Sequence, residues 1–200
     1  MMAAAGTRDG GDNGLFYGSF ISLREVNYLA PMSGDVNREH QVVVNHLKSH
    51  VQPAVPPDEV SCRFEVCGKH QYTSQREFLQ TLNEHGLSRA TYAADEKFRE
   101  DTKLRKELNK KSEKMVEEQR MNVEEQARLV GEPVLYGQTI QLRHVATGAF
   151  IKVKAQSAFV DRGSLMVSME EYGDLGSWLR VYPGYKTKAD GEQVTFGDLI

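Results

Sequence analysis

Apolar and polar residues alternate in short runs near both ends of the chain, which is the pattern of half-buried β-strands. The run 136–153, YGQTIQLRHVATGAFIKV, alternates on both sides of the residues ATG and therefore predicts a hairpin. Turn signals separate these runs every 10 to 15 residues, so a β barrel or sandwich is expected. The expected strands are residues 15–26, 40–47, 60–72, 164–169 and 177–182, the two arms of the hairpin, and one beginning at 194.

The middle of the chain has a helical pattern instead. Thr73 or Ser74 is expected to cap a helix that runs to residue 85, where Gly86 would end it. Residues 87–130 contain neither glycine nor proline, and they would span about 65 Å as one helix. Opposite charges recur four residues apart at 95/99, 101/105, 107/111 and 124/128, and the apolar stripe is thin. We therefore expect a projecting helical arm that docks near its ends.

Composition narrows the function classes. The net charge of −3 gives no case for binding nucleic acid or an acidic membrane surface, and we expect neither partner. Residues 1–13 are predicted to be a disordered tail without the apolar segment of a secretory signal. Cys62 and Cys67 are expected to be reduced thiols in a strand, which fits a cytosolic segment.

The residue pattern predicts no catalytic, metal or cofactor site. His46 and His50 are four apart, but a strand-to-loop region does not place that spacing on one face. We expect His144 to pack and form hydrogen bonds at the end of the hairpin rather than to act as an acid or base. Trp178, the only tryptophan, alternates with its neighbours in GSWLRV and is expected to be a structural core residue.

Three stretches resemble a known family. They are VLYGQTIQLRHVATGAFIKV, GSWLRVYPGYK and DGEQVTFGD, and they are similar to the N-terminal suppressor domain of the inositol trisphosphate and ryanodine receptors. The resemblance implies a mainly β fold, a β-trefoil with an inserted helix-turn-helix arm. It places the first lobe at 14–72, the arm at 73–131, and the second lobe with the start of the third at 132–200. Because most of the third lobe is missing, we expect the front of a longer protein or a truncated gene model.

The resemblance also implies a function. It suggests a regulatory, non-enzymatic domain of a tetrameric calcium-release channel, at the cytosolic face of the endoplasmic reticulum and without direct membrane contact. Inositol trisphosphate would bind downstream of these residues, and the partners would be neighbouring domains and subunits. In the family, a Pro-x-Tyr-Lys loop couples this domain to its neighbours, which points here to Tyr185 and Lys186.

Two other functions fit parts of the pattern. HVATG also suits a MIR-type β-trefoil module of lumenal proteins, but the sequence contains one clear copy of the motif rather than three. In the other alternative, the charged helix binds a helical partner and the β domain is its scaffold. The ryanodine branch is expected to have a shorter helix in place of the arm, so the arm favours the inositol trisphosphate branch.

Overall fold

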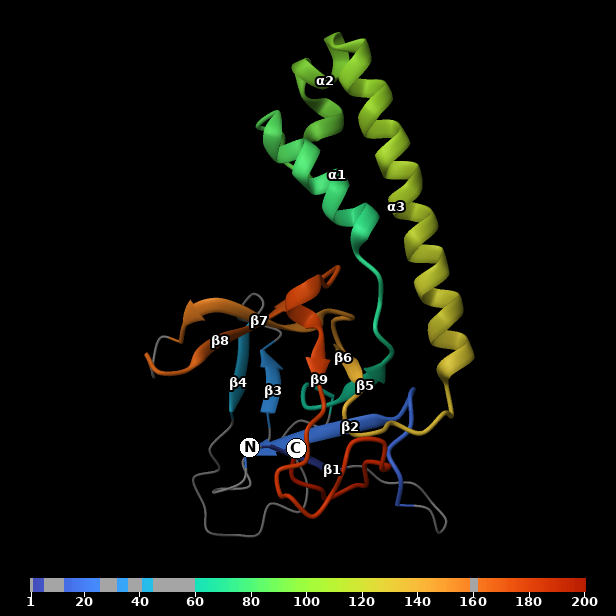
Figure 1. The fold of residues 1–200 in the computed structure, drawn as a ribbon. Coiled ribbons are helices and arrows are strands. Elements are labelled where there is room, and N and C mark those ends of the chain that lie inside the picture. The colour runs from blue at the N-terminus through green and yellow to red at the C-terminus, as the bar shows by residue number, and fades with distance from the viewer. Residues whose placement is uncertain (1, 6–12, 26–31, 36–40, 45–59, 159–161) are drawn as a thin grey trace. The chain divides into compact units, whose positions relative to one another are not determined.

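The chain divides into two compact units (Figure 1). The structure is a computed structural model that describes residues 2–5, 13–25, 32–35, 41–44, 60–158 and 162–200. Met1–Lys69 and Leu129–Ile200 form one unit, which we call the β unit, and His70–Arg128 form the other, the helical unit. The segments on either side of the helices therefore belong to one folded body.

The described strands of the β unit form one antiparallel sheet in the order β1-β2-β5-β6-β7-β8-β4-β3, with β9 paired to β6. Strand β5 comes before the helical unit and β6 after it, and their register pairs Phe64 with His144 and Val66 with Leu142. This pairing joins the two halves of the β unit. The strands are Met2–Ala5, Phe20–Glu25, Met32–Asp35, Gln41–Val44, Phe64–Cys67, Thr139–His144, Phe150–Ser157, Leu165–Glu170 and Leu179–Arg180 for β1 to β9.

Three sequence expectations differ from these strands. Residues 2–5 form β1, although a disordered tail is expected over 1–13, because backbone groups alone can pair with β2. Strand β2 starts at Phe20, five residues later than expected. Cys62 lies in a turn before β5, so only Cys67 is in a strand. The expected mainly β fold with an inserted helical arm is confirmed.

A three-fold repeat lies at the centre of the β unit. Its copies are NGLFYGS at 13–19, EPVLYGQ at 132–138 and EQVTFGD at 192–198. In each copy a fully buried apolar residue, namely Leu15, Val134 or Val194, lies between two bridged residues. The Leu15 N–H donates to Val194 O at 2.7 Å, Val194 N–H to Val134 O at 2.9 Å, and Val134 N–H to Leu15 O at 2.8 Å. These bonds close a ring, which is compatible with a β-trefoil.

The turn that follows each buried residue is also repeated. Gly18, Gly137 and Gly197 all have positive φ, between 81° and 91°, a conformation that costs glycine little. The aromatic residue before each glycine donates its backbone N–H to the start of the next copy. These bonds run from Tyr17 to Glu132 O at 3.0 Å, from Tyr136 to Glu192 O at 2.9 Å and from Phe196 to Asn13 O at 2.9 Å.

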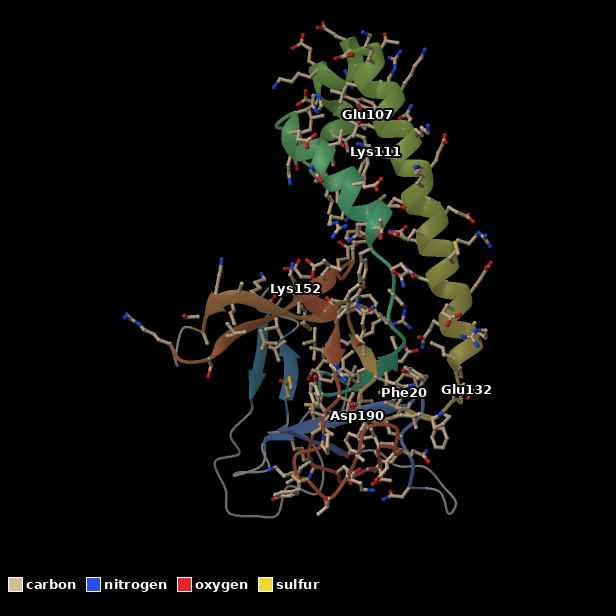
Figure 2. The ribbon with its side chains drawn as sticks, in the orientation of Figure 1. Phe20, Glu107, Lys111, Glu132, Lys152 and Asp190 are labelled. Atoms are coloured by element: carbon tan, nitrogen blue, oxygen red, sulfur yellow. The ribbon has the colours of Figure 1, made fainter. Side chains whose placement is uncertain are left out.

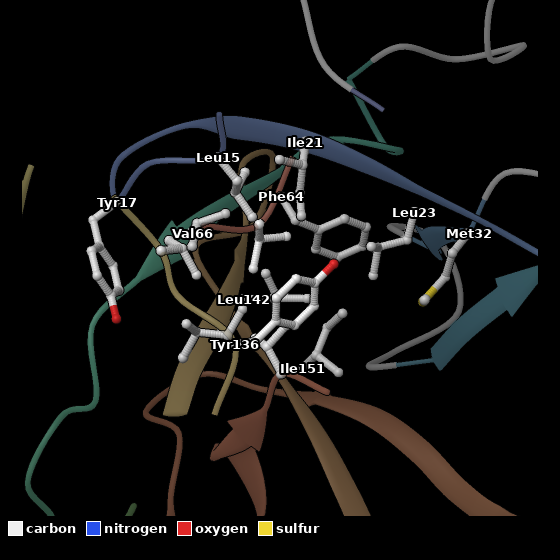
Figure 3. Close-up of a cluster of buried hydrophobic side chains, with 14 residues drawn as sticks. Leu15, Tyr17, Ile21, Leu23, Met32, Phe64, Val66, Tyr136, Leu142 and Ile151 are labelled. Atoms are coloured by element: carbon white, nitrogen blue, oxygen red, sulfur yellow. The ribbon is translucent and has the colours of Figure 1, made fainter. Parts of the chain in front are cut away.

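The inward side chains of the sheet and of these turns form one apolar core (Figure 3). Phe64 and Val66 of β5 are fully buried against Leu142 of β6 and Ile151 of β7. Each buried aliphatic or aromatic side chain of this kind contributes about 1.5–3 kcal/mol by leaving water. The core draws on residues from 15 to 194, so the β unit cannot form until distant parts of the chain meet.

The helical unit contains α1 (Thr73–Glu84), a short 3-10 helix η1 (Tyr92–Ala94), α2 (Glu96–Glu100) and α3 (Thr102–Leu129), whose last residue belongs to the β unit. The single long helix expected over 87–130 is therefore interrupted. Asp95 and Asp101 cause the breaks, because their carboxylates accept backbone N–H bonds from Lys97 and from Lys103 and Leu104. Aspartate favours such N-cap positions over helix interiors.

The helical unit has its own apolar core. Phe78 and Leu82 of α1 are buried against Leu104 and Leu108 of α3. Tyr92 stacks edge-to-face on Phe78 at 5.5 Å and on Phe98 at 5.3 Å, which continues the contact toward α2. The expected arm is thus a small packed body rather than an isolated helix.

Side chains of α3 hold the start of α1. The Glu118 carboxylate accepts the N–H groups of Ser74 and Gln75 at 2.9 and 3.2 Å, a favourable place for an anion. Asn122 bonds both the N–H and the C=O of Gln71 at 2.8 and 2.9 Å. The expectation that Thr73 or Ser74 caps the helix is wrong, because α1 has no side-chain cap at its N-cap residue and Glu118 supplies the acceptor. Of the expected charge pairs, Glu107 and Lys111 meet at 2.8 Å (Figure 2).

Candidate interdomain contact loop

Residues 181–191, which we call the contact loop, form a loop of the β unit. Both ends of this loop lie beside the second copy of the repeat. At its start the Val181 N–H donates to Gln138 O at 3.0 Å, and Gly137 N–H donates to Val181 O at 2.9 Å. At its end Gly191 N–H donates to Tyr136 O at 2.9 Å. Both ends of the loop are therefore fixed to the same turn.

The middle of the loop is also held. Gly184 N–H donates to Leu199 O at 2.7 Å, and a Cβ at this position would lie 2.8 Å from the Leu199 Cβ and 2.9 Å from its carbonyl oxygen. Only glycine lets the two backbones approach this closely. The loop is thus braced against Leu199, which directly follows the third copy of the repeat, although Tyr182, Tyr185 and Lys186 are exposed.

Arg180 contacts one residue near each end of the contact loop. The Arg180 guanidinium lies 4.9 Å from the centre of the Tyr182 ring, within the range of a cation–π contact. Its Nη2 donates to Asp190 Oδ2 at 3.3 Å. Asp190 in turn lies against Gly137, where a Cβ would come within 2.9 Å of the carboxylate carbon. Arg180 therefore orients Tyr182 while staying half exposed.

The two residues that the sequence singles out lie on this loop and point outward. The side chain of Tyr185 is 62% exposed and Lys186 is exposed, whereas Tyr182, which sequence reasoning missed, is 54% exposed. The signal for Tyr182 was present in the sequence, since Tyr182 and Tyr185 flank Pro183 and Gly184. Two half-exposed tyrosines on a braced loop are typical of an interface, because a ring covers much area at little cost in entropy.

His144 occupies a buried polar position. Its ring lies 3.0 Å from the Thr147 hydroxyl through Nδ1 and 3.0 Å from Ser61 O through Nε2, and it packs on Phe64 at 5.3 Å. Gly34 also packs close to this histidine, since a Cβ at Gly34 would lie 2.9 Å from the His144 ring. His144 thus connects the hairpin turn to the segment before β5.

Trp178 follows the short 3-10 helix η2 (Leu175–Ser177) and directly precedes β9. It is half-buried and is not among the residues of the core cluster. The Lys69 ammonium lies 4.1 Å from the centre of its ring.

Groups suited to metal binding or nucleophilic chemistry do not gather in the described part of the chain. No three histidine, cysteine or acidic side chains within it are placed to hold a metal ion. His46 and His50 lie outside the described residues. Both cysteines are buried and neither is in a disulfide, and burial together with the nearby Glu65 raises the pKa of Cys67 to about 12. No described helix is long and apolar enough to cross a membrane.

Comparison with known proteins identifies the family of the chain. The family profile described as "Inositol 1,4,5-trisphosphate/ryanodine receptor" matches residues 13–200. The chain belongs to the inositol 1,4,5-trisphosphate/ryanodine receptor family. Among its relatives, the inositol 1,4,5-trisphosphate receptor itr-1 of Caenorhabditis elegans is 28% identical over 151 residues, which cover 74% of this chain. The same residues make up 5% of that receptor.

Membership of the receptor family confirms the resemblance drawn from the sequence. The match extends over the helical unit and over all three copies of the repeat. The contact loop, residues 181–191, lies inside the matched region.

Proposed function

We propose that this chain is a regulatory, non-enzymatic segment of an inositol trisphosphate-gated calcium-release channel. The single observation that carries the proposal is a family match over both folded units together with a braced loop whose tyrosines point to solvent. In this proposal the β unit is a β-trefoil whose third lobe starts with the third copy of the repeat. Inositol trisphosphate binds to another part of the receptor, and the partners are neighbouring domains and subunits at the cytosolic face of the endoplasmic reticulum.

The mechanism follows from the energetics of coupled states. A loop that contacts a neighbouring domain better in the resting state lowers the apparent affinity for the ligand, because binding must break those contacts. A coupling free energy of about 1–3 kcal/mol is ordinary and corresponds to a 5- to 150-fold change in affinity. Tyr185 and Lys186 are the residues that we assign to this contact.

The test is a chimera of the C. elegans receptor in which the matched segment is replaced by this chain. Tyr185→Ala is expected to raise the affinity for inositol trisphosphate, because the resting-state contact is lost. It is also expected to weaken ligand-evoked calcium release, because the loop no longer transmits ligand binding to the neighbouring domain. Tyr172→Ala is the matched control, since Tyr172 is 45% exposed and lies outside the contact loop. Unchanged binding and unchanged release in Tyr185→Ala would reject the coupling role.

A second candidate function rests on the helical unit. Val116 and Val123 of α3 are 58% and 68% exposed and lie seven residues apart, on one face of the helix. An apolar pair of this kind suits a helical partner. If the helical unit has this function, the double variant Val116→Ser and Val123→Ser should abolish capture of the helical partner by the full chain. The affinity of the receptor chimera for inositol trisphosphate should stay unchanged in this variant.

A further inference from the structure

We propose that Tyr182 of the contact loop and Arg180, the residue directly before the loop, form a second anchor and that this anchor binds an acidic protein segment. This inference rests on the proposed function, because it specifies the chemistry of the partner that the loop contacts. It starts from Tyr182, whose ring is more than half exposed and yet is held by a cation at 4.9 Å.

The position of Tyr182 differs from that of an ordinary surface tyrosine. Its neighbour Val181 is buried and exchanges hydrogen bonds with residues 137 and 138, so the backbone beneath the ring is fixed. The Arg180 guanidinium next to it removes part of the freedom of the ring before any partner arrives. An interface side chain that is ordered in the free protein loses little entropy on binding.

The charges of the loop indicate the partner. Residues 180–190 contain three cations, Arg180, Lys186 and Lys188, and one anion, Asp190, although the whole chain carries a net charge of −3. The loop is therefore a basic and aromatic patch on an acidic chain, and it would attract an acidic surface through electrostatic complementarity. A guanidinium can bind a carboxylate through two parallel N–H groups, which makes Arg180 the residue suited to recognise it.

Asp190 sets the strength of this recognition. It accepts a hydrogen bond from Arg180 at 3.3 Å, and both side chains are at least half exposed. A carboxylate of the partner must compete with Asp190 for the same guanidinium. Removing this internal competitor should therefore strengthen binding of an acidic partner, whereas a loop that only supports the fold would gain nothing from the change.

The experiment titrates the 200-residue chain with a short peptide in which leucine recurs every three or four residues among glutamates. A peptide with lysine in place of every glutamate is the control. We expect Tyr182→Ala and Arg180→Ala each to weaken binding of the acidic peptide about tenfold, and Asp190→Asn to strengthen it severalfold. Tyr172→Ala should have no effect. Circular dichroism of each variant checks that the fold is retained.

Several outcomes would overturn the inference. It fails if the lysine peptide binds as well as the glutamate peptide, if Asp190→Asn weakens binding, or if Tyr182→Ala behaves like Tyr172→Ala. In the receptor chimera, an effect of Tyr185→Ala without any effect of Tyr182→Ala would reject the second anchor and leave the proposed function standing. No effect of either variant on ligand affinity would reject both.

Discussion

The three-fold repeat is broken at its aromatic position, because the third copy has a phenylalanine where the other two copies have a tyrosine. The Tyr17 hydroxyl donates to Gln138 Oε1 at 3.1 Å, and the Tyr136 hydroxyl donates to Asp198 Oδ2 at 2.8 Å, each reaching the next copy. The third copy has Phe196 at this position, and the residue it would reach by the same rule is Ser19. Among the described residues, the buried Ser19 hydroxyl has no hydrogen-bond partner, as expected if Phe196 fails to supply one.

We predict that Phe196→Tyr stabilises the β unit. The added hydroxyl would meet Ser19 Oγ, and a hydrogen bond of this kind contributes about 0.5–1.5 kcal/mol. The free energy of unfolding in urea measures the gain. Tyr17→Phe is the matched control and should lose a similar amount. A lower stability of Phe196→Tyr would show that Ser19 and the third copy do not meet as the repeat requires.

Asp198 links stability to pH. Burial acts to raise its pKa, but the N–H of Thr195 and the hydroxyls of Tyr136 and Thr195 together outweigh burial, so the pKa lies below its usual 3.8. A carboxyl group whose pKa is lowered by folding stabilises the protein above the unfolded pKa and loses that contribution as the pH falls through the folded pKa.

We therefore predict a specific acid sensitivity. Asp198→Asn should reduce the free energy of unfolding at pH 7, and the difference from the wild-type chain should shrink as the pH falls below 3.8. Urea denaturation at several pH values gives this comparison. A difference that stays constant with pH would mean that the charge of Asp198 is not responsible.

At the level of elements, Gly86 follows the end of α1 with a positive φ, as expected, and aspartates divide the helical region that comes after it. Asp101 starts α3 by accepting the N–H groups of Lys103 and Leu104 at 2.8 and 3.0 Å, and the Leu104 N–H contributes most to the lowered pKa of this carboxyl group. The same charge pattern that suggests four ion pairs along one helix also contains these two caps. The spacing of the charges alone does not show whether an aspartate forms an ion pair along a helix or caps the start of one. Both roles place an acid at the same positions.

Asp101→Ala is predicted to destabilise the helical unit and to lower its thermal unfolding midpoint through the loss of this cap. Asp95→Ala serves as the comparison and should cost less, since the five-residue α2 contributes no buried residue. Thermal unfolding followed by circular dichroism at 222 nm measures both. Equal effects of the two variants would argue that the start of α3 does not depend on Asp101.

At the level of the whole molecule, the two units have separate cores. The helical unit buries Phe78, Leu82 and Leu108 among its own side chains, and Glu118 and Asn122 fix its first residues from within. The β unit has its core assembled from both ends of the chain around the ring of Leu15, Val134 and Val194. Each unit therefore packs most of its buried side chains against other residues of the same unit.

This separation predicts that a fragment of residues 70–128 folds alone. Its circular dichroism should show a helical spectrum with a cooperative thermal transition, although at about 60 residues its stability will be marginal. Leu108→Ala should abolish the transition, because Leu108 is fully buried in that core. A fragment without any cooperative transition would show that the helical unit depends on the β unit.

The sequence by itself determined the kind of most of the long elements and the family. Alternation around residues 139–153 and charge spacing in 102–129 are local properties, so strands, helix and the resemblance could be recognised from neighbouring residues. Only the tertiary structure decided which residues meet across the chain. The ring joining Leu15, Val134 and Val194, the capping of α1 by Glu118 and the Arg180–Tyr182 contact result from packing and register. Short local patterns do not specify such partners, because many pairings satisfy them equally well.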